Sequence, residues 1–282
     1  MKNRKLNVYL HNFYILSGKI IGISIFIFMF TTLTIWISGV DAAKSLGDPF
    51  DGNSLQNNNW KWKASNVEGA EPNEWDVGNT KEGWLHITGE VNRNLWPSDT
   101  TNRLYQVPEG DFDVETHVYI NYTGGCVVSG LTAYSPTTKD RQNRDGEWVT
   151  IKLWGRQNDA IIQWQKRQFD GGEGLRGHVP GFQDPAGEMD IYMRLSREGN
   201  TFNAWWKREA NEDWIHIGET EQEFNEPLEV GIYSGICTGS GTLTTQFEYF
   251  VDNLTPSDVS PRAKLPIAWG ALKQRHSLPS SR

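Results

Sequence analysis

The sequence predicts an all-β sandwich. From Phe50 to Leu254, short segments of alternating apolar and polar residues are separated by turns rich in Gly, Pro, Asn and Asp, a pattern typical of antiparallel strands. This region contains no convincing amphipathic helix. The chain has 28 Gly and 13 Trp among 282 residues, which favours strands and turns. We therefore expect one sandwich domain of about 200 residues, a size that all-β domains reach.

The N-terminal stretch precedes this domain. Four basic residues come before an uncharged, apolar run over residues 20–40, and the run is long enough to span a bilayer core, which needs about 20 residues. The small residues of 40–42 instead suit cleavage by a signal peptidase. A cleaved signal peptide and a retained membrane anchor thus both remain open. Either one places the rest of the chain outside the cytoplasm, as a secreted or N-terminally anchored protein.

Three regions follow from these boundaries. Residues 1–43 are predicted to be a signal peptide or membrane anchor with an apolar export helix, and 44–255 to form the β-sandwich. Residues 256–282 contain four prolines and several Lys and Arg residues, which predicts a flexible basic tail.

Five segments within the sandwich show the strand period of two. In 147–154, Val149, Ile151 and Leu153 point to one face and Trp148 to the other. Residues 129–134, 161–167, 190–195 and 200–206 read in the same way. If these strands share one sheet, their outward residues form one solvated patch, consisting of Tyr134, Trp148, Lys152, Trp154, Gln163, Gln165, Arg167, Arg194, Asn203 and Trp205.

This patch suits a carbohydrate. Aromatic rings stack on the apolar faces of sugar rings, while amide and guanidinium groups hydrogen-bond their hydroxyl or acidic groups. Two alternatives need no ligand: loops of the sandwich cover the face, or the aromatic residues pair across strands. An oligo- or polysaccharide is the predicted partner, and a protein-binding adhesion module is a further alternative. Nucleic acid is not expected, because the net charge is −8 and no basic stripe occurs.

The two cysteines, Cys126 and Cys237, lie in similar glycine-containing contexts and are predicted to form a disulfide outside the cytoplasm. Two buried thiols are the alternative. No metal site is predicted, because the cysteines lack a His or Asp cluster. The glycine-dense segment 168–178 carries Asp170 and Glu173, but it lacks the alternating acidic ligands of a calcium loop. We therefore predict no cofactor.

Several short motifs occur in a recognisable order. They are Asp48–Leu55 followed by Trp60 and Trp62, then 83–87, 110–116, 130–134, 194–202 and 230–234. Together they resemble the concanavalin A-like domain at the C-terminus of bacterial β-xylosidases, over residues 48–255. The resemblance implies a jelly-roll sandwich of two antiparallel sheets and an accessory, lectin-like, carbohydrate-associated role rather than catalysis. No β-xylosidase catalytic domain accompanies it, and the fold alone does not decide function.

Glycosidase activity is not expected. Jelly-roll glucanases carry Glu-x-Asp-x-x-Glu on one strand, and Glu188 and Asp190 begin that pattern, but Met193 replaces the second glutamate. Residues 50–55 and 94–96 also resemble exported 3-keto-disaccharide hydrolases, for which Glu115, His117 or Arg194 would supply acid-base or charge-stabilising groups. That hydrolase is the alternative function, and no catalytic residue is assigned.

Overall fold

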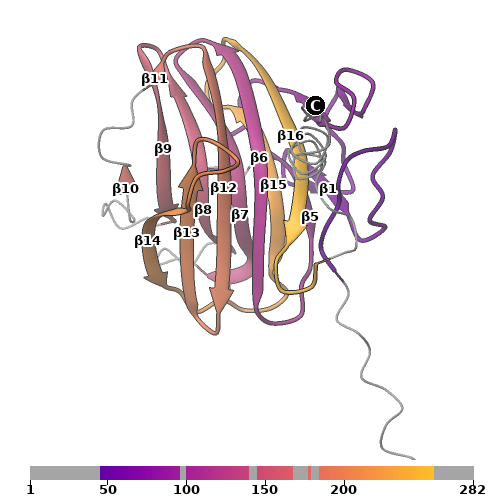
Figure 1. Ribbon diagram of the computed structural model, residues 1–282, viewed down its shortest axis with the longest axis vertical. Coiled ribbons are helices and arrows are strands. Elements are labelled where there is room, and N and C mark those ends of the chain that lie inside the picture. Colours follow the sequence, from indigo (N-terminus) through magenta and orange to yellow (C-terminus); the bar gives the residue numbers. More distant parts are fainter. Residues whose placement is uncertain (1–44, 96–99, 140–144, 168–176, 179–183, 257–282) are drawn as a thin grey trace, which may run out of the picture. The chain divides into compact units, whose positions relative to one another are not determined.

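The computed structural model describes residues 45–95, 100–139, 145–167, 177–178 and 184–256 (Figure 1). The predicted export segment lies outside the described residues, as do most of the glycine-dense segment and nearly all of the basic tail. All regular structure within the described ranges is β-strand, as the alternating pattern predicts. None of the described segments forms a helix of the length and apolarity that crossing a bilayer requires.

A nine-stranded sheet makes one layer, in the order β10-β9-β8-β7-β15-β5-β1-β2, with β11 also paired to β9. Its strands are β1 (Lys61–Ala64), β2 (Val67–Glu68), β5 (Asn102–Gln106), β7 (Cys126–Lys139), β8 (Asp145–Arg156), β9 (Asp159–Lys166), β10 (Gly177–His178), β11 (Asp184–Pro185) and β15 (Glu229–Ile236). Every pairing between them is antiparallel.

A seven-stranded sheet makes the second layer, in the order β14-β13-β12-β6-β16-β4-β3. Its strands are β3 (Trp75–Val77), β4 (Leu85–Thr88), β6 (Phe112–Thr123), β12 (Glu188–Glu198), β13 (Thr201–Lys207), β14 (Ile215–Glu221) and β16 (Thr242–Asp252). These pairings are antiparallel as well. The structure thus confirms an all-β fold of two antiparallel sheets.

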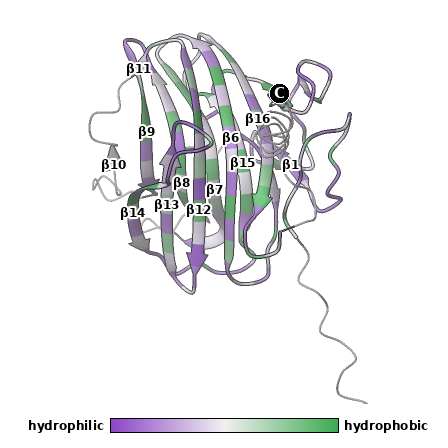
Figure 2. Cartoon of the chain, viewed as in Figure 1, coloured by the Kyte–Doolittle hydropathy of each residue, from purple (hydrophilic) through white to green (hydrophobic). Residues whose placement is uncertain are grey.

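The core lies between the two sheets, because each strand sends alternate side chains inward. Ile151 and Leu153 of β8 belong to the same buried cluster as Val118 of β6 and Phe247 of β16, and Figure 2 shows apolar and polar residues alternating along the strands. Burying each such side chain contributes about 1.5–3 kcal/mol. The inner faces share this core, so the two outer faces point in opposite directions.

The chain passes between the layers at short turns. Gly124 has a φ of 101° in the two-residue connection from β6 to β7, a conformation that a residue with a Cβ rarely adopts. In the β8–β9 hairpin, Arg156 at the end of one strand forms a paired ionic contact with Asp159 at the start of the next. These turns fix the register of β7, β8 and β9, which carry most of the predicted patch.

Candidate functional site

The ten residues of the predicted patch do not lie on one sheet. Arg194, Asn203 and Trp205 belong to β12 and β13 of the seven-stranded sheet, and the other seven belong to β7, β8 and the end of β9 in the nine-stranded sheet. The prediction of one shared patch is therefore wrong. Strand periodicity identifies the face of a strand that points outward, but it does not identify the sheet that the strand joins.

Register brings the nine-stranded group together in rows. Tyr134 of β7 lies opposite Trp148 of β8, and Lys152 lies opposite Gln163 of β9. Thr150, between these rows, lies opposite Gln165. We call this surface the polar face: the outward residues of β1, β5, β15, β7, β8 and β9. It presents aromatic, amide and cationic groups side by side.

The polar face is not the solvated platform that the sequence predicts. Trp148 is 0%, Gln163 2% and Lys152 5% exposed, while Trp154 is half-buried. One reason is that Leu95 packs with Tyr134, Trp148 and neighbouring residues into a second apolar cluster outside the main core. Aromatic residues on this side of the sheet are therefore partly used for packing.

Polar groups on this face make hydrogen bonds with one another. Lys152 Nζ donates to Gln165 Oε1 at 2.8 Å, and the hydroxyls of Thr150 and Tyr233 lie 2.8 Å apart. Burial raises the pKa of Tyr233, which therefore remains a neutral phenol. These contacts hold the side chains in fixed positions on the sheet.

Sequence reasoning missed the part of the polar face that comes from shorter strands. Lys63 of β1, Arg103 of β5 and Glu229 of β15 are all less than 10% exposed. Lys63 Nζ lies 2.6 Å from Glu229 Oε1, and the Arg103 guanidinium lies 3.8 Å from the centre of the Tyr134 ring. The polar residues on either side of the apolar Leu104 indicate an outward face, but a strand of five residues is too short to establish the alternation from the sequence.

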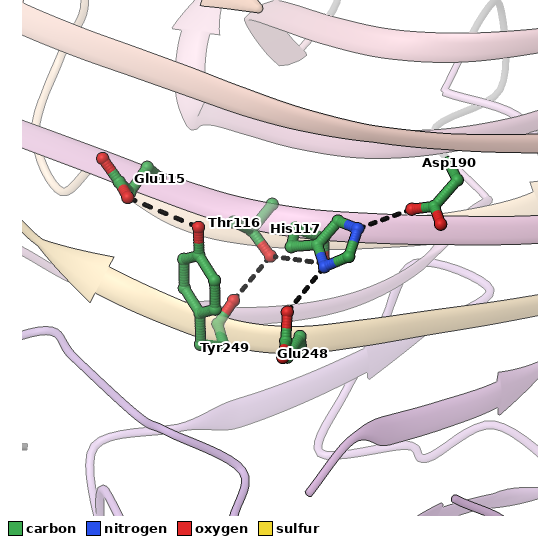
Figure 3. A network of polar contacts seen from close by, with 6 residues as sticks. All are labelled: Glu115, Thr116, His117, Asp190, Glu248 and Tyr249. Carbon is green, nitrogen blue, oxygen red and sulfur yellow. Dashed lines mark hydrogen bonds and ion pairs between the residues drawn. The ribbon is translucent and has the colours of Figure 1, made fainter. Parts of the chain in front are cut away.

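The opposite face, on the seven-stranded sheet, carries a separate network (Figure 3). His117 of β6 lies between Asp190 of β12, at 2.5 Å from Nε2, and Glu248 of β16, at 2.6 Å from Nδ1. Both partners are carboxylates, which accept hydrogen bonds, so this arrangement favours the protonated imidazole, in which both ring nitrogens donate. Burial lowers the pKa of His117, but the hydrogen bonds and charges of the two carboxylates outweigh this effect and raise it above its ordinary value.

Aromatic rings enclose this imidazolium. Tyr192 stacks on it with ring centres 4.1 Å apart, and Trp84 lies 5.0 Å away with Lys81 over its indole. Burial, together with the nearby charges of Glu248 and Asp190, raises the pKa of Tyr192 to about 12. The network is thus a self-satisfied ionic cluster.

The acidic groups of this face are not arranged for glycoside hydrolysis. The imidazole of His117 fills the space between Asp190 and Glu248, where two catalytic carboxylates would need to hold a glycosidic bond. Met193 is fully buried in the core, because β12 pairs with β6 without a bulge that would turn it outward. Glu115, for its part, accepts hydrogen bonds from Asn253 and Tyr249.

The three predicted residues on this sheet have local partners. Arg194 Nε donates to Asp113 at 2.7 Å and its guanidinium lies over the Trp205 ring. Asn203 Oδ1 lies 2.9 Å from a ring nitrogen of His216. These contacts are cross-strand pairs of the kind that stabilise a sheet without a ligand.

The two cysteines form a disulfide across a sequence separation of 111 residues. Cys126 begins β7, and Cys237 directly follows β15. The bond therefore joins the ends of two neighbouring strands that carry the polar face. Among the described residues, no group of three His, Cys, Asp or Glu side chains is placed to hold a metal ion.

Comparisons with known proteins establish the fold. Neither a protein-family model nor a curated protein matches the sequence. A mutant of the GH43 protein BlXynB from Bacillus licheniformis is 13% identical, with a TM-score of 0.51 over 73% of this chain and 38% of that one. A GH43B protein labelled xyloglucan PUL, from Bacteroides ovatus, is 14% identical, with a TM-score of 0.54 over 77% and 40%.

A bifunctional GH43-CE protein from Bacteroides eggerthii is 13% identical, with a TM-score of 0.54 over 79% of this chain and 27% of that one. The chain thus spans less than half the length of each of these proteins. At 13–14% identity these similarities concern the fold.

Proposed function

We propose that this chain is a non-catalytic carbohydrate-binding module of the concanavalin A-like type, and that its glycan contacts the polar face of the nine-stranded sheet. The observation that carries this proposal is the burial of charged, amide and aromatic side chains together on an outer sheet face. Charged side chains are rarely buried, because desolvation is costly unless partners compensate it. A fold that needs only a core between its sheets gains little from this arrangement, whereas polar groups placed beside aromatic rings are typical of ligand sites.

The residues divide into two roles. Trp154, which is half-buried, offers a ring surface for stacking, and Gln163, Gln165 and Lys152 supply donors and acceptors for hydroxyls. Tyr134 is buried under the Arg103 guanidinium and supports that side chain. Arg167, at the end of the same row, donates to the carbonyl of Gly146 and borders the site. Trp148 is fully buried in the cluster with Leu95 and therefore supports the face by packing. Arg194, Asn203 and Trp205 are not part of the proposed site.

The glycoside-hydrolase neighbours in fold support the class of ligand. We further propose that the module acts outside the cytoplasm. The disulfide supports this location, because such bonds persist in oxidising compartments. Residues 20–40 would then serve as a cleaved signal or as a membrane anchor.

Two half-buried tryptophans on opposite sheets make a matched test of the binding face. On a glycan array, Trp154→Ala should lose most of the retention of the wild-type protein, because stacking on an aromatic ring is lost. Trp205→Ala, on the other sheet, should retain it. Equal binding by the two variants would exclude the polar face, and absence of any glycan hit for the wild type would refute the proposed function.

The alternative hydrolase predicts turnover instead. Incubation of the wild-type protein with a 3-keto-disaccharide, followed by detection of the released monosaccharides, separates the two functions. If the wild type forms product and His117→Gln does not, the hydrolase function would replace the proposed binding function.

A further inference from the structure

Arg103 is the least satisfied charged group in the part of the chain that the structure describes. Its side chain is 1% exposed, and none of its three guanidinium nitrogens makes a hydrogen bond. Its contacts are stacking on the Tyr134 ring at 3.8 Å and an ion pair with Glu229 Oε2 at 3.4 Å. A guanidinium has five N–H donors in a rigid fork, so most of its bonding capacity is unused.

The position of the guanidinium follows from the register. Arg103 lies opposite Tyr233 of β15, while Tyr134 lies opposite Glu229 of the same strand. The side chain of Arg103 therefore crosses β15 at the intervening residue, Gly231, which has no side chain to block it. A Cβ at Gly231 would lie 2.1 Å from the carbonyl oxygen of Leu104. A residue with a side chain therefore does not fit at this crossing point.

The carboxylate of Glu229 does not provide acceptors for the N–H donors of the Arg103 guanidinium. Glu229 Oε1 already accepts a 2.6 Å hydrogen bond from Lys63, and its Oε2 makes no hydrogen bond. Lys63 also pairs with the exposed Glu68, at 3.2 Å, so the two carboxylates balance the charges of Lys63 and Arg103 but leave the Arg103 donors without hydrogen bonds. Leaving charged donors buried without acceptors costs free energy, and proteins retain such a cost mainly at functional sites.

We infer that Arg103 binds the carboxylate of an acidic sugar, so that the proposed glycan contains uronic acid residues. A carboxylate accepts two parallel hydrogen bonds from a guanidinium fork. The Tyr134 ring contacts one face of the guanidinium, and the hydrogen-bonding capacity of its three nitrogens is unused. This inference rests on the proposed function, since it names the ligand class of the same face.

The test compares each acidic polymer with its neutral counterpart. Binding of the full chain to glucuronoxylan, polygalacturonate and alginate is measured by affinity electrophoresis, alongside the same polymers after carboxyl reduction. The wild type should prefer at least one acidic polymer over its reduced form by roughly 10- to 100-fold, the range expected for a charge-assisted pair. The preference should also weaken as salt is raised.

Three variants separate ligand binding from a structural role. Arg103→Met should abolish the acidic preference, and its thermal midpoint, measured alongside, reports the separate cost of losing the ion pair with Glu229. Arg103→Lys keeps the charge without the fork and should retain only part of the preference. Arg194→Gln, an arginine of the opposite sheet, should bind like the wild type.

The outcomes distinguish the two proposals. Equal binding of acidic and reduced polymers by the wild type would overturn the inference and leave the proposed function standing. An unchanged preference in Arg103→Met would do the same, as would a preference for sulfated over carboxylated polymers. A wild type that binds none of these polymers, acidic or reduced, on this assay or on the array would overturn both.

Discussion

Replacing both Cys126 and Cys237 with Ala should destabilise the protein severely. The bond closes a loop over a sequence separation of 111 residues, and the loop-entropy relation gives about 5 kcal/mol at 25 °C for a loop of that length. For a domain of about 200 residues, each kcal/mol shifts the thermal midpoint by roughly 2–4 °C, so we expect a fall of about 10–20 °C. Circular dichroism melting and urea titration measure both quantities.

The wild type in reductant provides the control, because it loses the same bond without a change of side chain. The reduced wild type and the double variant should melt together. A loss of unfolding free energy below about 1 kcal/mol would refute the loop argument. A variant far less stable than the reduced wild type would show that the alanines act by packing instead.

Three further changes have defined outcomes. The ionic cluster of His117 should stabilise the fold fully below the ordinary histidine pKa of 6.5, and this stabilisation should be lost as pH rises through the raised pKa of the folded state. In a pH titration of the free energy of unfolding, His117→Gln should remove that pH dependence. Gly231→Ala should cost about 3 kcal/mol through overpacking, whereas Gly125→Ala, where a Cβ meets nothing within 4 Å, should change the urea midpoint little. Met193→Glu should not create a hydrolase. It should lower the free energy of unfolding by about 3 kcal/mol or more, because it buries a carboxyl group in the core. A soluble, stable variant would contradict the inward position of this residue.

The face of each long strand was predictable from the sequence, because a period of two is a local property. Ile151 and Leu153 lie in the core as expected, and Met193 lies there too. Sheet membership was not predictable, because β12 and β9 are near in sequence but join different sheets. The separation of Arg194 and Trp205 from Trp148 follows from that topology alone.

The chemistry of the candidate site depended on contacts that are distant in sequence. Lys63 and Glu229 are 166 residues apart and still form a buried ion pair. No local pattern around Arg103 indicates that its donors lack acceptors, since that fact depends on the crossing at Gly231. Burial of the whole face was likewise invisible to periodicity, which distinguishes two sides of a strand but not their exposure.

The cluster around His117 has a mechanical consequence for the sheet that carries it. Asp190, His117 and Glu248 come from β12, β6 and β16, which are adjacent strands. The imidazolium is therefore a cross-tie over three strands, in addition to their backbone ladders. Sliding β6 along its neighbours would break both charge-assisted hydrogen bonds, and sliding β12 or β16 would break one of them. One layer of the sandwich is thus braced against shear, which provides a rigid backing for the layer on which we propose the glycan site.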